Sequence, residues 1–220
     1  GGAKADVSVV VPRSIALTLG VVSASALISG LNTDAKLNTV SGDIIVDGLT
    51  GDLDVNAVSG DVQVRGLLGS LNAHSVSGDI AATGTLHRAD ADTVSGNVLF
   101  DSEGPISRIN INTVSGNSTV RIDAGYPADF VVRTVSGKVI IDGARISGTG
   151  TTNYTGSIGE LSGQFVDVRV NSVSGDLAVL RREAAGGVAS QNDSSSESTS
   201  ASERGAEFGS DFGHDLGNDF

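Results

Sequence analysis

The stretch Thr39-Val40-Ser41-Gly42-Asp43 returns along the sequence with small changes, and this repetition decides the fold. The first four copies of its Val-Ser-Gly core are each 18 residues apart. All copies begin at a valine, namely Val40, Val58, Val76, Val94, Val114, Val135 and Val173. A fixed period of this length is typical of proteins that stack one structural unit many times.

Each repeat unit contains two short segments in which apolar and polar residues alternate, such as 53–58 and 62–64. Alternation with a period of two indicates β-strands. In the first segment the apolar alternation slips by one residue before Val58, which predicts a bend or β-bulge at the Thr/Ala/Ser position that Ala57 occupies. Glycines return at two fixed phases and mark corners with positive φ or no room for a Cβ. They are Gly30, Gly48, Gly66 and Gly84 at one phase, and Gly42, Gly60, Gly78 and Gly96 at the other.

A unit this short cannot bury its own apolar face, but identical units stacked in register bury one another's. The sequence therefore predicts an all-β fold, a single-stranded parallel β-solenoid (β-helix) with an 18-residue period over residues 1–182. At the strand spacing of about 4.8 Å, we expect about nine coils. The interior is predicted to hold columns of like residues, such as Ile44/Val62/Ile80/Val98 and Val46/Val64/Ala82/Phe100.

Beyond residue 100 the spacing of Val-Ser-Gly lengthens to 20, 21 and 38 residues. Residues 143–165 are predicted to form either a protruding loop or one irregular coil. The charges of Arg181, Arg182 and Glu183 are expected to blunt an open edge at the end of the stack. Residues 183–220 hold eight acids and one arginine and are rich in Ser and Gly, so we predict a disordered acidic tail. Because position 1 is not methionine, we expect the chain to be a piece of a longer protein.

The net charge of −12 disfavours nucleic acid and anionic membrane surfaces as partners. No apolar run approaches the roughly 20 residues that a membrane-spanning helix needs, so direct membrane insertion of this segment is not expected. The absence of cysteine excludes disulfides and thiolate metal sites. The remaining partner classes are a protein or a glycan of unknown identity, or a second copy of the chain.

Two columns of polar residues recur at fixed positions in the repeat. The first follows the corner glycine and contains Asp43, Asp61, Asp79, Asn97, Asn117, Lys138 and Asp176. Stacked carboxylates can bind calcium, which makes Asp43, Asp61 and Asp79 candidate ligands. However, an Asp or Asn after a corner glycine usually accepts backbone N–H bonds, and a lysine in the column argues against a row of metal ions. We therefore favour a corner role.

The second column is predicted to face outward and is rich in asparagine, whose amides can hydrogen-bond along a stack. It contains Asn38, Asn56, His74, Asp92, Asn112, Arg133 and Asn171. His74 and His87 fall in different columns, and no nucleophile–base set or phosphate-binding loop is present. The sequence therefore predicts no enzyme, no catalytic residues and no cofactor.

The pattern Val-Ser-Gly-Asp-Ile/Val-x-Val-x-Gly-Leu-x-Gly, with Val-Ser-Val-Val-Val-Pro-Arg at residues 7–13, resembles the bacterial, actinobacterial-type DUF4097 adhesin-like β-strand repeat family over residues 4–182. The resemblance implies a parallel β-solenoid with an adhesin-like role and no catalytic residues to carry over. We therefore expect a non-enzymatic scaffold or binding surface of the bacterial cell envelope. One alternative is a calcium- or glycan-binding β-helix, with or without activity on polysaccharides, that uses the aspartate column. Another is a cytoplasmic assembly or regulatory scaffold.

Overall fold

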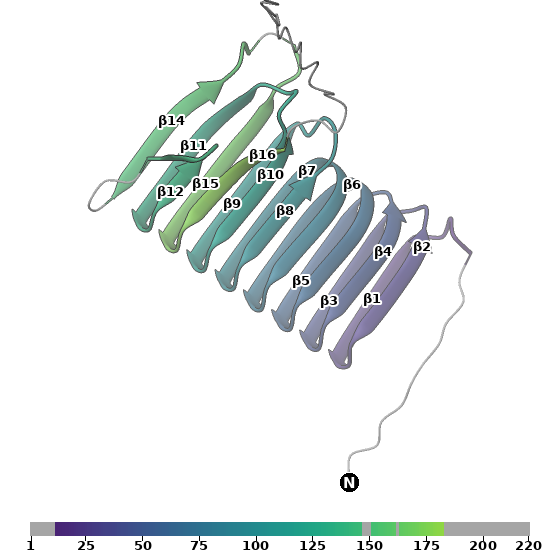
Figure 1. The fold of residues 1–220 in the computed structure, drawn as a ribbon. Coiled ribbons are helices and arrows are strands. Elements are labelled where there is room, and N and C mark those ends of the chain that lie inside the picture. The colour runs from purple at the N-terminus through teal and green to yellow at the C-terminus, as the bar shows by residue number, and fades with distance from the viewer. Residues whose placement is uncertain (1–11, 147–150, 162, 183–220) are drawn as a thin grey trace, which may run out of the picture. The chain divides into compact units, whose positions relative to one another are not determined.

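A computed structural model of the chain describes residues 12–146, 151–161 and 163–182, and within these ranges it contains strands and no helix (Figure 1). In chain order the strands are β1 (Leu17–Ser23), β2 (Ala26–Leu31), β3 (Ala35–Ser41), β4 (Ile44–Thr50), β5 (Leu53–Ser59), β6 (Val62–Ser77), β7 (Ile80–Ser95), β8 (Val98–Ser102), β9 (Arg108–Ser115), β10 (Ser118–Asp123), β11 (Ala128–Ser136), β12 (Val139–Ile141), β13 (Ala144–Arg145), β14 (Thr152–Ile158), β15 (Val166–Ser174) and β16 (Leu177–Arg182). All sixteen belong to one sheet that winds around a single core. The predicted all-β solenoid is confirmed.

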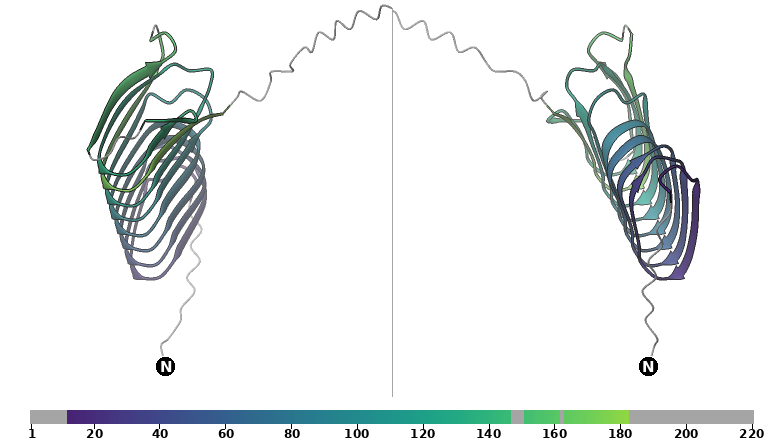
Figure 2. Two further views of the ribbon diagram at one scale, coloured as in Figure 1. Left: turned by 60° about the vertical axis from the view of Figure 1, so that its left-hand side comes forward. Right: turned by 90° about the vertical axis from the view of Figure 1, so that its right-hand side faces the viewer.

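One coil consists of two strands that meet at the Val-Ser-Gly corner, and the strands of successive coils pair in parallel (Figure 2). The strands that lead into this corner form one face, which we call the groove face. The strands that leave the corner form the back face. β6 and β7 are long enough to run through both faces, so the first half of β6 pairs with β4 and its second half pairs with β5.

The corner glycines allow successive coils to approach closely. Gly78 has a φ of +127°, and a Cβ at this position would collide with the backbone of Gly60 in the preceding coil. At the second glycine phase, Gly48 has a φ of +68°, in the left-handed region that glycine adopts at little cost. Both glycine series therefore lie at corners, as the sequence predicts.

The core is narrow and mostly aliphatic, and the columns predicted to line it are buried. Ile44, Val62, Ile80 and Val98 are each 1% exposed. The second predicted column, which ends at Phe100, is at most 1% exposed. The alternation of the strands therefore places every second side chain inside, as a parallel solenoid requires.

The bulge predicted at the Ala57 position is wrong. Leu53, Val55 and Ala57 are all buried and Val58 is exposed, so the alternation continues inward through the small residue. β5 and β6 stay in register across this position, with Ala57 opposite Ser75. The irregularities in register lie instead between β6 and β7, near their middle. The apparent slip arose because the strand ends on an outward-facing apolar residue.

The coils are not stacked entirely in chain order. Six coils follow one another from β1–β2 to β9–β10, with β6 and β7 each shared by two coils. The last coil, β15–β16, then lies between the β9–β10 coil and the β11–β12 coil. Figure 1 shows this as a break in the colour sequence, where the light green β15 lies between the teal β9 and β11. The final coil of the described chain is therefore intercalated.

A short connection makes room for the intercalated coil. Asp123 ends β10 and Ala128 begins β11, so residues 124–127 span the thickness of one coil. The two ends of the intercalated coil meet this connection, because the Val166 N–H donates to the Pro127 carbonyl and the Ala124 N–H donates to the Arg182 carbonyl. The open side of the β15–β16 coil thus lies at the connection, and the chain does not have to thread through a closed loop.

Within the segment predicted as a loop or an irregular coil, the described strands β13 and β14 pair antiparallel with the strands of the outermost coil and do not form a further parallel coil. β14 pairs antiparallel with β11, and β13 pairs antiparallel with β12. Antiparallel strands supply the backbone partners that another parallel coil would supply, without continuing the repeat.

With the two out-of-order coils, the described chain contains eight parallel strands on the groove face, in the order β1, β3, β5, β6, β7, β9, β15 and β11. This is fewer than the nine coils predicted. The predicted acidic tail, residues 183–220, lies outside the described residues. None of the described segments forms a helix that could cross a membrane.

Candidate functional site

The groove face carries a row of outward-facing valines from the Val-Ser-Gly repeats. In β3, Leu37 and Thr39 point into the core, whereas Asn38 and Val40 point outward. Val40 is 49% exposed, and the equivalent valines of the later repeats are 49–53% exposed. In spatial order the row contains Val22, Val40, Val58, Val76, Val94, Val114, Val173 and Val135.

These valines form one wall of a groove of about 1070 Å³ that runs along the stack. The other wall is the predicted polar column, two residues earlier in each strand, and the floor is formed by small residues such as Thr39 and Ala57. We call this feature the valine groove. Its length follows from the repeat, because every coil contributes one residue to each wall.

The polar column forms a ladder of side-chain hydrogen bonds, as the sequence predicts. The Asn56 Nδ2 donates to Asn38 Oδ1 at 3.1 Å, and the Asn112 Nδ2 donates to Asp92 Oδ1 at 2.6 Å. His74 Nδ1 lies 3.0 Å from Asp92 Oδ2. These bonds hold the polar wall in a fixed arrangement while leaving part of each side chain open to a partner.

The intercalated coil continues the valine groove without interruption. Asn171 Nδ2 donates to Asn112 Oδ1 at 2.8 Å, although the two residues are 59 positions apart in the chain. Asn171 therefore takes the next place in the polar column after Asn112, ahead of Arg133. Sequence order alone placed Arg133 there, so this neighbour relation was missed.

The floor of the groove covers a row of buried hydroxyl groups. Thr39, Ser75, Thr93, Thr113 and Thr134 are between 3% and 5% exposed, and their hydroxyl oxygens have no hydrogen-bond partner among the described residues. Ala57 occupies the same position in β5, so the hydroxyl is not required for the coil to form. The small side chains of this row therefore contribute to the groove floor by filling the space beneath it.

The aspartate column makes corner hydrogen bonds from coil to coil. The Asp61 N–H donates to Asp43 Oδ1 at 3.0 Å, the Asp79 N–H donates to Asp61 Oδ1 at 2.9 Å, and the Asn97 N–H donates to Asp79 Oδ1 at 2.7 Å. Each side chain thus accepts the backbone N–H of the same position in the next coil. All three calcium candidates take this role, which agrees with the favoured corner interpretation. The described residues contain no group of three acidic or histidine side chains placed to hold a metal ion.

The coil order explains why the column ends in a lysine. The Asp176 N–H donates to Asn117 Oδ1 at 2.9 Å, and the Lys138 N–H donates to Asp176 Oδ1 at 2.8 Å. Lys138 is the last parallel position, so no further backbone N–H in the column needs an acceptor from its side chain. A residue without an acceptor is therefore tolerated there.

The comparison with protein families matches the part of the chain in which the 18-residue repeat is regular. Residues 15–98 match the Toastrack DUF4097 family model. This Toastrack segment covers β1 to β7 and the first residue of β8, and the match supports the DUF4097 resemblance of the repeats. Comparison with curated proteins and with solved structures gave no match.

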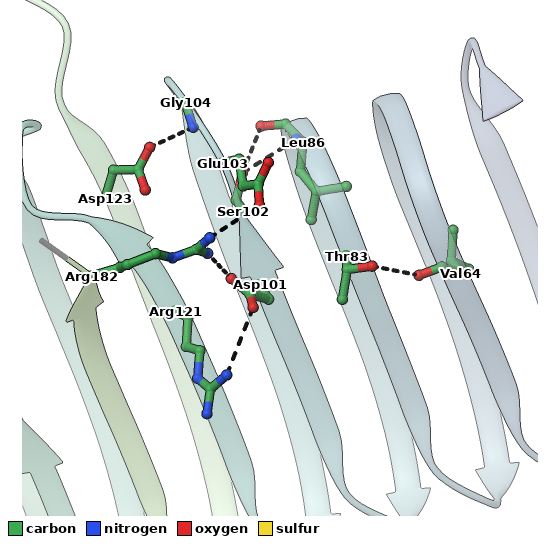
Figure 3. Close-up of polar contacts among 10 residues, drawn as sticks. All are labelled: Val64, Thr83, Leu86, Asp101, Ser102, Glu103, Gly104, Arg121, Asp123 and Arg182. Carbon is green, nitrogen blue, oxygen red and sulfur yellow. Dashed lines mark hydrogen bonds and ion pairs between the residues drawn. The ribbon is translucent and has the colours of Figure 1, made fainter. Parts of the chain in front are cut away.

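The intercalated coil, which lies outside the Toastrack segment, is fastened to the back face by arginines. The Arg182 guanidinium pairs with Asp101 and lies 3.1 Å from Glu103 Oε1, which belong to a coil two places away (Figure 3). Arg121 Nη1, from the strand between them, lies 3.8 Å from Asp101 Oδ2. Arg181 donates to the Ala124 carbonyl in the connection. β16 is not the end of the stack, because β10 pairs with it on one side and β12 on the other. The pairing with β12 stops at Val179, however, so Arg181 and Arg182 have a strand partner on the β10 side alone among the described residues.

A second, more charged groove lies near the starts of the groove-face strands. Here Lys36 Nζ is 3.2 Å from Asp54 Oδ2, and Arg88 Nε is 2.5 Å from Asp90 Oδ2. The hydrogen bond to Asp90, together with its charge, raises the pKa of Arg88 above its ordinary value. Both cations are well exposed, and exposed ion pairs contribute little to stability. The two cations of this groove are therefore paired within the chain, and Asp34 and Asp52 accept backbone N–H groups.

Proposed function

We propose that the protein is a non-enzymatic, adhesin-like scaffold of a bacterial cell envelope that makes its contacts through the valine groove. The Toastrack match and the solenoid fold fit a scaffold. The observation that carries the proposal is the unbroken row of half-exposed valines along all eight parallel strands of the groove face. Contiguous exposed apolar surface of this kind marks interaction sites in soluble proteins.

The polar groups of the groove also support binding more than chemistry. His74 has Asp92 beside it at 3.0 Å, and Asp92 in turn accepts from Asn112, so the acid is part of a side-chain ladder. The hydroxyl groups beneath the groove are buried in the floor and face the core. A nucleophile would have to lie within hydrogen-bond reach of its base in an accessible site. We therefore propose that the groove binds and does not catalyse.

The calcium-dependent alternative has weaker support. The Oδ1 atoms of Asp43, Asp61 and Asp79 already accept backbone N–H groups of the next coil. A cation would have to compete with these bonds or use the remaining carboxylate oxygens. The glycan-binding alternative shares the valine groove with our proposal, since amides of the polar column can donate to hydroxyl groups.

The proposal is tested by binding of the purified full chain to isolated cell envelopes of the organism that makes it. The variant V76D/V94D places two charges in the valine groove, and the matched control Q63D/L68D places two charges on exposed positions outside it. We expect the groove variant to lose most of its binding and the control to keep it. Equal binding by both variants, or location of the native protein in the cytoplasm, would contradict the proposal.

A further inference from the structure

We propose that the partner of the valine groove is a second copy of this chain, which packs groove face to groove face with its stack running in the opposite direction. The inference rests on the proposed function in taking the groove as the contact surface, and it adds the identity of the partner. It follows from the apolar row, from the symmetry of the polar column and from the area available.

The apolar row suits a copy of itself. Each valine from Val40 to Val173 in the repeats is about half exposed, and Val22 at the first coil is 69% exposed. A two-fold axis that runs across the groove, perpendicular to the stack, sets valine against valine and polar wall against polar wall. Closed homodimers of this type use the same patch on both copies. The first parallel strand of one copy then faces the eighth strand of the other.

The polar column is complementary to itself under this symmetry. When all eight parallel strands of the groove face overlap, the fourth strand in spatial order, β6, faces the fifth, β7, of the second copy. His74 therefore faces Asp92 of the second copy. Asn56 then faces Asn112 of the second copy, and Asn38 faces Asn171 of the second copy. At the eighth position, the long side chain of Arg133 faces Gly20 of the second copy, which has no side chain to obstruct it.

The pairing at the axis favours this arrangement over its competitors. Each copy already holds His74 Nδ1 within 3.0 Å of Asp92 Oδ2, so two such pairs meet at the axis with unlike groups alternating. A shift by one strand sets His74 or Asp92 against its own symmetry mate. A parallel arrangement needs a two-fold axis along the stack, which reverses the strand direction and sets the polar column of one copy, including Asp92 and Arg133, against the valine row of the other. Only full overlap sets the imidazole of His74 against the carboxylate of Asp92 at the axis, so the antiparallel register with full overlap is selected.

The area indicates a dimer that dissociates on dilution. Eight strands at about 4.8 Å spacing and a width of roughly 15 Å give about 600 Å² per copy, against about 800 Å² per partner in a standard interface. The back face is less suited to a copy of itself, because polar residues interrupt its outward apolar row and the neighbouring outward row contains the paired Asp101 and Arg121. That apolar row consists of Leu27, Ile45, Gln63, Ala81, Leu99, Thr119, Ala178 and Ile140. The valine groove is thus the surface on which a second copy fits.

The first experiment is analytical ultracentrifugation of the full chain from micromolar to millimolar concentration. We expect the wild-type mass to rise from one chain to two, V76D/V94D to remain at one chain, and Q63D/L68D to behave as wild type. Thermal melting verifies that each variant is folded. A wild-type protein that stays monomeric throughout, or a groove variant that still dimerises, would overturn the inference.

The second experiment tests the direction of packing, and it benefits from the absence of native cysteine. Val40 and Val173 lie at the second and seventh positions of the row, too far apart to form a disulfide within one chain. Mixed under oxidising conditions, the V40C protein and the V173C protein are expected to form a covalent heterodimer. V40C alone is expected not to cross-link. Cross-linking of V40C with itself would instead show parallel packing and overturn the antiparallel register.

The two proposals fail in different ways. If the wild type is monomeric and V76D/V94D still loses binding to envelopes, the groove is a contact surface for another molecule, and only the dimer is wrong. If the dimer forms as expected and envelope binding does not depend on the groove, the dimer stands and the proposed function is wrong.

Discussion

At the level of single residues, the buried hydroxyls under the valine groove should lower the stability of the fold, because they are removed from water without a partner among the described residues. Thr93 is 5% exposed, and its hydroxyl oxygen has no hydrogen-bond partner among the described residues. Valine has the same shape without the polar atom, so T93V should raise the free energy of unfolding by about 1 kcal/mol. The exposed substitution T50V serves as the control. A lower melting temperature for T93V would show that the hydroxyl is satisfied by a bound water molecule.

The corner aspartates allow a matched comparison of acceptor and charge. In D61N the side chain keeps an oxygen that can accept the Asp79 N–H, whereas in D61A this N–H loses its acceptor. We expect D61A to lose about 1 kcal/mol of stability and D61N to stay close to wild type. K138A should have no effect, because Lys138 ends the column.

The same aspartates decide the calcium alternative. If Asp61 only forms a corner, millimolar calcium should leave the melting temperature of the wild type unchanged, because only a ligand that binds the folded state stabilises it. A rise of several degrees that disappears in D61N would instead favour calcium binding at this column.

At the level of the strand, the alternation in β6 predicts very different effects for neighbouring residues. Val62 is 1% exposed, whereas Gln63 points outward and accepts a hydrogen bond from Arg65. V62D buries an unpaired charge and should cost about 3–5 kcal/mol. Q63D should change stability by no more than about 0.5 kcal/mol. Equal melting temperatures for the two variants would mean that the register of the strand is wrong.

The position of the intercalated coil can be tested with paired cysteines. Ser174 lies opposite Ser115 on one side and Ser136 on the other. S115C/S174C and S136C/S174C should therefore form disulfides, since neighbouring strands fall within the Cα separation of about 4.4–6.8 Å that a disulfide requires. S115C/S136C should not, because a whole coil separates the two positions. Rapid oxidation of S115C/S136C would indicate coils stacked in chain order.

The sequence predicts the regular coils well and the order of the last ones poorly, for one physical reason. Within the repeat, the alternation and the glycines determine which residues are buried, and Val62 and Gly78 behave as expected. Because every coil carries the same repeat, any coil can be the neighbour of any other. The polar column beside Asn112 can be continued by Asn171 or equally by Arg133. Local pattern therefore leaves the coil order open. The longer-range contacts of Arg182 and the connection 124–127 decide it.

At the level of the whole molecule, two antiparallel strands of the described chain cover the last coil of the stack. β14 pairs with β11 and β13 pairs with β12, so the outer coil has antiparallel partners. A chain that ends at Glu183 should therefore keep the melting temperature and the β-sheet circular dichroism of the full chain. The full chain measured in parallel is the control, and a clearly lower melting temperature after truncation would show that the acidic segment stabilises the solenoid.

The intercalated coil also restricts how such a protein can change its length during evolution. β16 is the last described strand, yet it has β10 on one side and β12 on the other, so a unit duplicated after Arg182 finds no free edge to join. Duplication or loss of an 18-residue unit between Asp43 and Asn97 changes the stack by a single layer of about 4.8 Å and leaves its neighbours intact. Relatives of different length should therefore differ in the number of units before β9, while the interleaved half from β9 to β16 keeps a constant size.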